Sequence, residues 1–233
     1  MSNLELLDSP VWTSLKDRHG KLGRVSGKAA VYDWEVSILG GLQEPNADAL
    51  ADLANLVEPG NAVALMGPLT DLPLDPCWEH VTRVEIHQMI CDDPQGFIEQ
   101  QYIELGSNDV GEMLALAAVT EPGPFSKRTI EMGTYLGIKE EGRLVAMAGE
   151  RLMPEGWSEV SGVCTHESGR GKGYAAALVG ELQRRIHARG ELSFLNVVKG
   201  SPSEASALGV YERVGFRKVR DMCVTVVINR SSE

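Results

Sequence analysis

Residues 168–175 have the sequence SGRGKGYA and lie between a predicted strand and a predicted helix. The preceding segment, WSEVSGVCT at 157–165, alternates as a strand does, and YAAALVGELQRRIHARG at 174–190 carries Ala, Leu and Ile on one helical stripe. Main-chain N–H groups at the start of a helix point outward at the positive end of its dipole and attract anions. Gly171 and Gly173 have no Cβ, so phosphate oxygens can approach the backbone. The stretch therefore predicts a phosphate-binding loop.

Two cationic side chains strengthen this interpretation. Arg170 and Lys172 add charged donors to the loop in a chain whose formal net charge is -11. Glycines alone are also typical of a flexible strand-to-helix turn, which is the alternative interpretation. A nucleotide-binding Rossmann domain is a poorer one, because these glycines lie late in the chain and lack the first glycine of G-x-G-x-x-G.

The loop also fits a family signature. Arg170, Gly173 and Ala175 match Arg/Gln-x-x-Gly-x-Gly/Ala, and YERVGF at 211–216 is similar to the Tyr-Glu-x-x-Gly-Phe that ends a later helix of that family. Over roughly residues 101–228 the chain resembles the GNAT superfamily of acyl-CoA N-acyltransferases in the order of its predicted elements. The whole chain looks most like the glycine-N-acyltransferase-like branch.

The resemblance implies an α/β (α+β) architecture, the GNAT fold, with a mixed, mostly antiparallel central sheet flanked by helices. It places a catalytic domain at 99–233 and makes residues 1–98, which carry no chemical motif, a degenerate GNAT-like α/β domain. The apolar pattern predicts helices at 9–20, 46–57 (capped by Asn46), 109–120 (capped by Ser107 or Asn108), 126–133, 174–190 and 203–215. It predicts strands at 28–39, 61–69, 83–91, 101–107, 157–165, 191–198 and 216–228, and two more within 134–153.

The resemblance further implies an acyl-CoA cofactor, most simply acetyl-CoA. The residues that would bind it are Val163, Cys164, Thr165, Arg170, Gly171, Lys172, Gly173, Tyr174, Ala175, Asn196 and Ser203. A backbone N–H within 163–165 would stabilise the oxyanion. In two respects the chain departs from the family: Glu204 stands where many members have an asparagine seven residues before the tyrosine, and the loop at 198–203 is longer than usual.

Four residues are candidates for the chemistry itself. An alkyl ammonium with a pKa of about 10.4 must lose a proton before it attacks a thioester. By resemblance Glu159 would be that base; the alternative is that it is a solvated carboxylate at the edge of the strand, with no catalytic role. His166 is a second candidate for the base. Tyr211 would protonate the departing thiolate, or else only anchor its helix by packing. Cys164 as a nucleophile is a rival mechanism that lacks an evident paired histidine.

Composition limits the partners. The acidic balance argues against nucleic acid and anionic membranes, which require a broad cationic face, and suits a cationic acceptor. With no apolar run of membrane length and four cysteines in no dense pattern, we expect a cytoplasmic protein with reduced thiols. A zinc site is a minor alternative to a metal-free chain, and its ligands would be Cys77, His80, His87 and Cys91.

The sequence thus predicts an acetyltransferase that acylates a primary amine of a small molecule or amino acid by direct attack in a ternary complex. The alternative is a non-catalytic acyl-CoA sensor or interaction module. The acceptor pocket is expected around 122–133 and 153–157, where Trp157 would line the pocket or cover the core. The sequence leaves the oligomeric state open, with a homodimer as one alternative.

Overall fold

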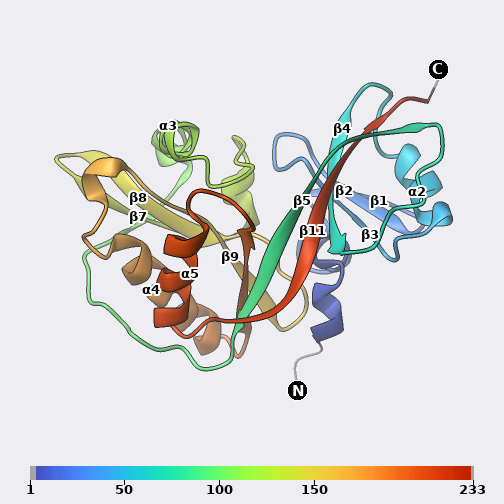
Figure 1. Cartoon of the computed structure of the whole chain (residues 1–233). Helices are drawn as coiled ribbons and strands as arrows, with labels where there is room; N and C mark the ends of the chain where they lie inside the picture. The colour runs from blue at the N-terminus through green and yellow to red at the C-terminus, as the bar shows by residue number, and fades with distance from the viewer. Residues whose placement is uncertain (1–3, 232–233) are drawn as a thin grey trace.

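The structure is a computed structural model that describes residues 4–231. One sheet of eleven strands crosses the molecule in the order β1-β2-β3-β4-β11-β5-β10-β9-β8-β7-β6 (Figure 1). Its strands are β1 Gly23–Ser26, β2 Ala29–Tyr32, β3 Leu39–Leu42, β4 Ala62–Pro68, β5 Trp78–Cys91, β6 Ile103–Leu105, β7 Tyr135–Glu140, β8 Arg143–Glu150, β9 Trp157–Thr165, β10 Leu192–Val198 and β11 Arg217–Asn229.

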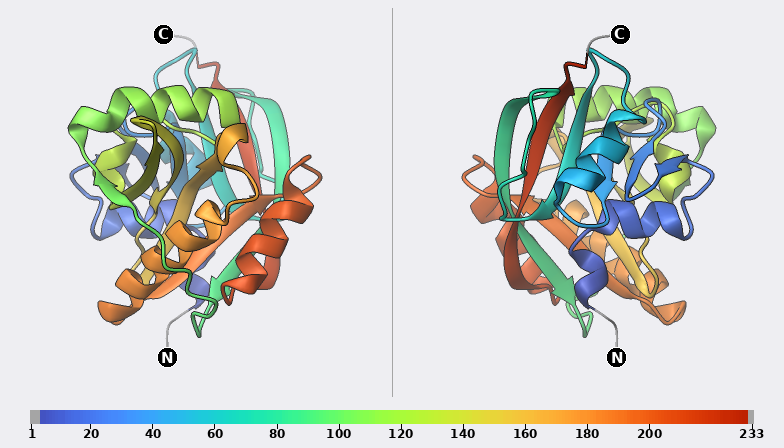
Figure 2. Two further views of the ribbon diagram at one scale, coloured as in Figure 1. Left: turned by 90° about the vertical axis from the view of Figure 1, so that its left-hand side faces the viewer. Right: turned by 90° about the vertical axis from the view of Figure 1, so that its right-hand side faces the viewer.

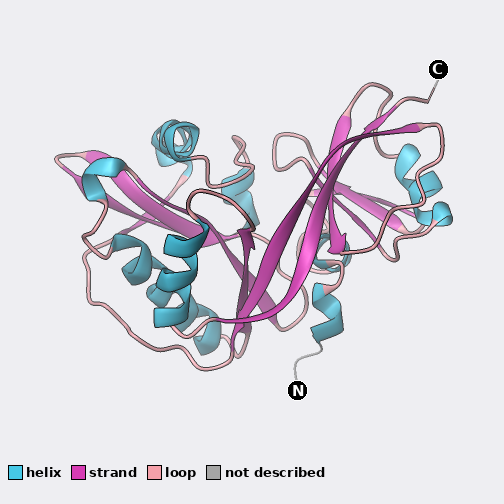
Figure 3. Cartoon of the chain, in the orientation of Figure 1, coloured by secondary structure: helices cyan, strands magenta, loops and turns pink. Residues whose placement is uncertain are grey.

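Helices cover both faces of this sheet (Figure 3). The α-helices are α1 Pro10–Lys16, α2 Ala47–Ala54, α3 Val110–Thr120, α4 Tyr174–Ala188 and α5 Glu204–Arg213, and the 3-10 turns are η1 Leu4–Leu7, η2 Ser107–Asp109, η3 Thr129–Met132 and η4 Glu167–Gly169. This mostly antiparallel sheet with flanking helices confirms the predicted fold class.

The two halves of the chain repeat one arrangement of elements. In the second half, α3 precedes the antiparallel strands β7, β8 and β9, and α4 then leads to β10, which lies parallel to β9. In the first half, α1 precedes β1, β2 and β3, and α2 leads to β4, which lies parallel to β3. The opposite side views show the two groups of helices at the two ends of the sheet (Figure 2).

The last strand of each half pairs with the other half. Strand β5 lies between β10 and β11, while β11 lies between β5 and β4, all antiparallel. The sheet is therefore continuous across the predicted boundary at residue 98, and the division into two domains stays a prediction.

Opposite faces of the second half of the sheet have separate apolar cores. Leu178, Val179, Leu182 and Ile186 of α4 have no exposed surface and pack with strand residues such as Val160. Helix α3 packs through Met113 and Leu116 against Tyr135 and Cys164. Full burial of one such aliphatic side chain contributes roughly 1.5–3 kcal/mol. The four buried residues of α4, all beyond its first turn, therefore hold the helix against the sheet.

Most predicted elements are confirmed, and the exceptions have local causes. Asn46 caps α2 as expected, accepting a bond from the N–H of Ala49 at 2.9 Å. The single strand expected at 28–39 is wrong, because Val36 donates to the carbonyl of Asp33 and the turn separates β2 from β3. The expected caps of α3 are also wrong: Ser107–Asp109 form η2, whose Gly106 N–H donates to Asp109. The segment expected as a helix at 126–133 forms only η3.

Candidate active site

A slot opens in the sheet where two parallel strands separate. Strands β9 and β10 are paired only from Leu192–Trp157 to Phe194–Glu159. Beyond this point β9 stays paired with β8, and β10 stays paired with β5. The facing edges of 160–165 and 195–198 are therefore not paired with each other, and this separation of β9 from β10 is called the slot below.

A β-bulge lies on one wall of the slot. The register of β8 and β9 shifts so that Gly162 and Val163 stand opposite Ala148 alone, and Gly162 has φ +61°. A bulge removes a backbone group from the ladder and re-aims its neighbours. This is the segment in which an oxyanion-binding N–H is predicted.

The predicted phosphate loop lies beyond the C-terminal end of β9, at the mouth of the slot. Gly171 and Gly173 have φ +77° and +79°, a conformation that favours glycine, and a Cβ on Gly171 would meet no atom within 4 Å. The first bond that ties α4 to the loop runs from the Ala177 N–H to the Gly173 carbonyl at 3.0 Å, so the earlier amides of the helix have no partner within it. The first turn of α4 carries no acidic residue. The loop therefore fits a diphosphate.

The side chains of the loop differ in their availability. Lys172 forms an ion pair with Glu140 at 2.7 Å, which raises the pKa of Lys172, and the Tyr174 hydroxyl donates to the same carboxylate. Arg170 is exposed and forms no ion pair with any residue in 4–231. Arg170 is thus the free cation of the loop, and an incoming anion would compete with Glu140 for Lys172.

The chain is similar to a known protein family and to a solved structure. A family described as FR47-like protein matches residues 135–225. A solved structure of a GNAT-family protein from Novosphingobium aromaticivorans is 36% identical, has a TM-score of 0.87, and the alignment covers 97% of this chain and 99% of that one. The chain belongs to the GNAT superfamily.

Two distant structures share the GNAT fold alone. A GCN5-related N-acetyltransferase from Kribbella flavida is 18% identical with a TM-score of 0.56 over 88% of each chain. A GCN5-related N-acetyltransferase-like protein from Streptococcus suis is 16% identical with a TM-score of 0.55, covering 93% of this chain and 91% of that one. No curated protein matches the chain. The glycine-N-acyltransferase-like placement stays a prediction.

In this GNAT chain, Glu159 is the most enclosed of the predicted site residues. It is 1% exposed, and its carboxylate accepts two bonds of 2.8 Å from the Arg151 guanidinium and one of 2.8 Å from the Asn196 side-chain amide. The Oδ1 atom of Asn196 is buried without a partner. Arg151 was not predicted; a charged pair in the apolar segment 143–153 is the only signal that could have indicated it. The role of Glu159 as a base stays a prediction.

The first half of the chain completes the surroundings of Glu159. The Ser14 hydroxyl accepts a bond of 2.8 Å from the Met153 N–H, and burial raises the pKa of the nearby Tyr32. His19 contacts the Tyr32 hydroxyl at 2.7 Å, and burial lowers the pKa of His19 to about 4, so this ring is neutral near pH 7. Both halves therefore contribute to the buried polar network beside the slot.

Tyr211 lies on α5 and Cys164 on β9, near enough for Cys164 to affect the pKa of Tyr211. The Tyr211 ring packs edge-on against Phe216 with centroids 6.0 Å apart, and burial raises the pKa of its phenol, with a smaller effect from Cys164. Among residues 4–231 the Tyr211 hydroxyl has no hydrogen-bond partner, which leaves it free to serve a ligand. Burial raises the pKa of the Cys164 thiol to about 11, so this thiol is protonated near neutral pH and is a poor nucleophile.

Three further residues considered in the sequence, His166, Ser203 and Glu204, lie at the starts of η4 and α5. His166 is half-buried at the start of η4, where its Nδ1 lies 2.9 Å from the Ser168 hydroxyl. Ser203 precedes α5 without a capping bond from its side chain. Glu204, which replaces the family asparagine, accepts from His87 at 2.7 Å and from the Gly200 N–H at 2.7 Å.

The four residues considered as zinc ligands do not form a metal site. His87 has both ring nitrogens engaged, one with Glu204 and the other with Asp221 at 2.6 Å, while Cys77 lies at the far end of β5 from Cys91. Within the described part of the chain, no group of three or more His, Cys, Asp or Glu side chains could hold a metal ion.

The expected acceptor region is tied to the first half. The Arg128 N–H donates to the Glu35 carbonyl at 2.9 Å, and the Thr129 hydroxyl donates to the Val36 carbonyl at 2.7 Å. Trp157 is 1% exposed and packs edge-on against Phe194, so it covers the core.

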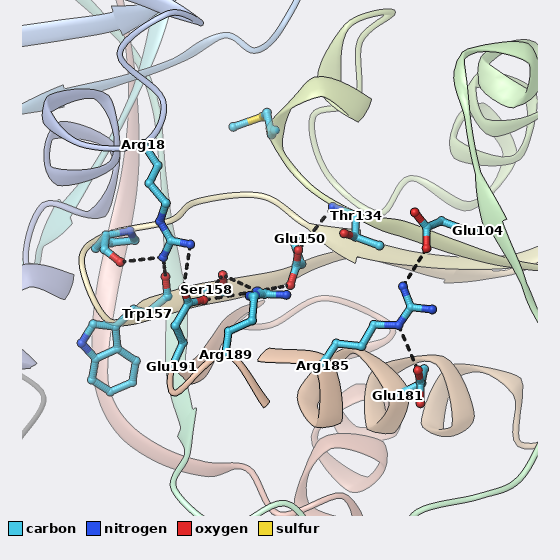
Figure 4. A network of polar contacts seen from close by, with 12 residues as sticks. Arg18, Glu104, Thr134, Glu150, Trp157, Ser158, Glu181, Arg185, Arg189 and Glu191 are labelled. Atoms are coloured by element: carbon cyan, nitrogen blue, oxygen red, sulfur yellow. Dashed lines mark hydrogen bonds and ion pairs between the residues drawn. The ribbon is translucent and has the colours of Figure 1, made fainter. Parts of the chain in front are cut away.

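A polar network fixes the turn that leads into β9 (Figure 4). Arg18 pairs with Glu191 at 2.8 Å and donates to the Trp157 carbonyl at 3.1 Å, while Arg189 pairs with Glu150 at 2.6 Å.

None of the helices within residues 4–231 is long and apolar enough to cross a lipid bilayer.

Proposed function

We propose that the protein transfers an acetyl group from acetyl-CoA to a primary amine of a small molecule or amino acid, by direct attack in a ternary complex. The observation that carries this proposal is that the glycine loop at 171–173 follows β9, the strand that separates from its parallel neighbour β10. Such a path suits a ligand with an extended arm and a diphosphate at one end. Acetyl-CoA supplies the acyl thioester.

Each wall of the slot has a proposed role in binding. Arg170 and the free amides at the start of α4 hold the diphosphate, because a helix N-terminus and a guanidinium both favour negative charge. An N–H within 163–165, which begins at the bulge, donates to the acyl oxygen, where negative charge develops. The unpartnered Oδ1 of Asn196 accepts from an N–H of a ligand in the slot, since a buried acceptor left unpaired costs about 1–3 kcal/mol.

Two residues would then handle protons. Tyr211 holds a proton on its Oη that neutralises the departing sulfur. Glu159 takes the proton of the acceptor ammonium, directly or through water. Its carboxylate is paired with the Arg151 guanidinium at 2.8 Å. A cytoplasmic location completes this proposal.

One observation favours the alternative of a non-catalytic acyl-CoA-binding module. The carboxylate of Glu159 already accepts from Arg151 and Asn196, so it has little capacity left for a substrate proton.

The experiment separates the two functions. The protein is incubated with acetyl-CoA and pooled primary amines, and acetylated products are identified by mass spectrometry. An enzyme yields a product that disappears in Tyr211→Phe while acetyl-CoA still raises the Tm of that variant. A module shows the Tm increase but yields no product above the protein-free control. Absence of any binding to acetyl-CoA would overturn both functions.

A further inference from the structure

The first half of the chain contains its own slot, at the position that corresponds to the acyl-CoA slot of the second half. Parallel strands β3 and β4 are paired only at Leu39–Ala64 and Gly40–Leu65, and then separate. A cavity of about 190 Å³ lies between their diverging ends, bounded on one side by Leu42 and on the other by β4 residues such as Met66. The repeated topology therefore gives each half a point where parallel strands part, and in the first half a cavity lies at this point.

This slot lacks any means of binding a diphosphate. The connection from β3 to α2 has the sequence Gln43-Glu44-Pro45-Asn46, without glycine or a cation. The Asn46 side chain already accepts from the Ala49 N–H, so the start of α2 is capped by the chain itself. Glu44, the charge in this connection, repels an anion.

The walls of the cavity are mostly apolar, and several of their polar groups are paired within the protein. The Ser9 hydroxyl donates to the Leu42 carbonyl at 2.5 Å, and the Cys223 thiol lies 3.1 Å from the Pro68 carbonyl. Asp8, at the rim, is paired with Arg220. The rest of the lining includes Leu42, Pro45, Leu65, Met66 and Leu72. An occupant therefore gains by burying apolar surface, and among the described residues of the lining the Glu44 carboxylate is the one charge that no cation pairs with.

The volume sets the size of the occupant. An apolar cavity of about 150 Å³ lined by aliphatic side chains stays dry and binds benzene. The cavity between β3 and β4, at about 190 Å³, has room for a benzene ring with a small substituent. We infer that the slot between β3 and β4 is a binding site for a small, uncharged, apolar molecule of about the size of toluene.

The site has a physical connection to the acyl slot. Met66 lines the cavity, and its Sδ lies 3.8 Å from the Asn196 side-chain nitrogen, which in turn donates to Glu159. An occupant of the cavity thus contacts a residue that touches the polar network of the catalytic half.

Gly67 allows the site to be closed without strain. It lines the cavity, its φ is not in the left-handed region, and a Cβ built on it meets only the Asp8 carbonyl oxygen, at 4.0 Å. Gly67→Leu should therefore fill the cavity. Gly111→Leu is the matched control, because Gly111 is an exposed residue of α3 and a Cβ added to it would have no atom within 4 Å.

The test is a toluene titration followed by thermal unfolding, since a ligand that binds the folded state raises its Tm. Toluene should raise the Tm of the wild type and of Gly111→Leu in a saturable way, and should leave that of Gly67→Leu unchanged. Equal responses of the wild type and Gly67→Leu, or no response of the wild type, would overturn the inference.

A second measurement uses the wild-type chain alone and so does not depend on a variant folding. In a crystal held under xenon pressure, xenon should occupy the space beside Leu65, Met66 and Cys223. A crystal without xenon in this slot would contradict the inference. Neither outcome involves acetyl-CoA, so the proposed acetyltransferase function is tested separately.

Discussion

Replacing Arg151 by Met should destabilise the protein strongly, because it leaves the Glu159 carboxylate buried without its counter-ion. The two side chains are 10% and 1% exposed and are joined by two bonds of 2.8 Å. Removing one partner of a buried pair typically costs about 3–5 kcal/mol. For a chain of this size each kcal/mol lowers the Tm by roughly 2–4 °C, so we expect Arg151→Met to lower it by roughly 6–20 °C.

Arg128 provides a control with the same geometry but little burial. Its guanidinium also makes two bonds of 2.8 Å to one carboxylate, that of Glu131, where the side chains are 36% and 41% exposed. Exposed pairs of this kind contribute about 0.2–1 kcal/mol, so Arg128→Met should change the Tm only slightly.

Urea unfolding of single and double variants completes the assay. Arg151→Met combined with Glu159→Gln removes both charges, and the double variant should lose less stability than the sum of the two single losses. If Arg151→Met is no less stable than Arg128→Met, or if the two losses simply add, the argument that these charges depend on one another is refuted.

Three further predictions concern the acyl slot and its supporting helix. Arg170→Ala should weaken binding of coenzyme A by roughly 10- to 150-fold, equivalent to the 1.5–3 kcal/mol of a charged hydrogen bond. The control Lys28→Ala removes a cation from the turn between β1 and β2, in the other half of the sheet, and should bind coenzyme A as the wild type does; both affinities are measured by calorimetry. Tyr211→Phe should lower kcat with little change in the Kd for acetyl-CoA, because only the proton donor is lost; an unchanged kcat would limit Tyr211 to packing. The bonds from Arg184, and then those from Arg185 and Tyr102, lower the pKa of Glu181 from 4.5 to about 2. Because a carboxyl whose folded pKa is depressed stabilises the protein above its unfolded value, this contribution should be lost as the pH falls from about 4.5 towards 2, and Glu181→Gln should flatten that part of the urea-measured stability profile.

The local sequence pattern was enough to predict the strand and the helix on either side of the glycine loop. The strand at 157–165 and the start of the helix at Tyr174 are as predicted, because alternation, glycine conformation and a helical apolar stripe are encoded within a few residues. Gly171 and Gly173, singled out in the sequence for their missing Cβ, have positive φ, a conformation that favours glycine.

Partnerships between distant segments could not be predicted in this way. The apolar pattern indicates that 83–91 and 216–228 are strands, but it does not say that each pairs with the other half of the sheet. The ion pair of Glu159 was missed for the same reason, since Arg151 lies on the far side of a turn whose geometry decides which side chains meet. Such choices depend on burial of charge and on register across the whole sheet.

The exchange of β5 and β11 has a consequence for synthesis of the chain. Until Arg217–Asn229 leaves the ribosome, β4 and β5 lack the strand that lies between them, so two sheet edges of the first half stay open up to that point. Contacts that join residues 62–91 to the last strand have a large separation in sequence and form slowly. The interval before closure is when a nascent chain is most exposed to pairing with another molecule.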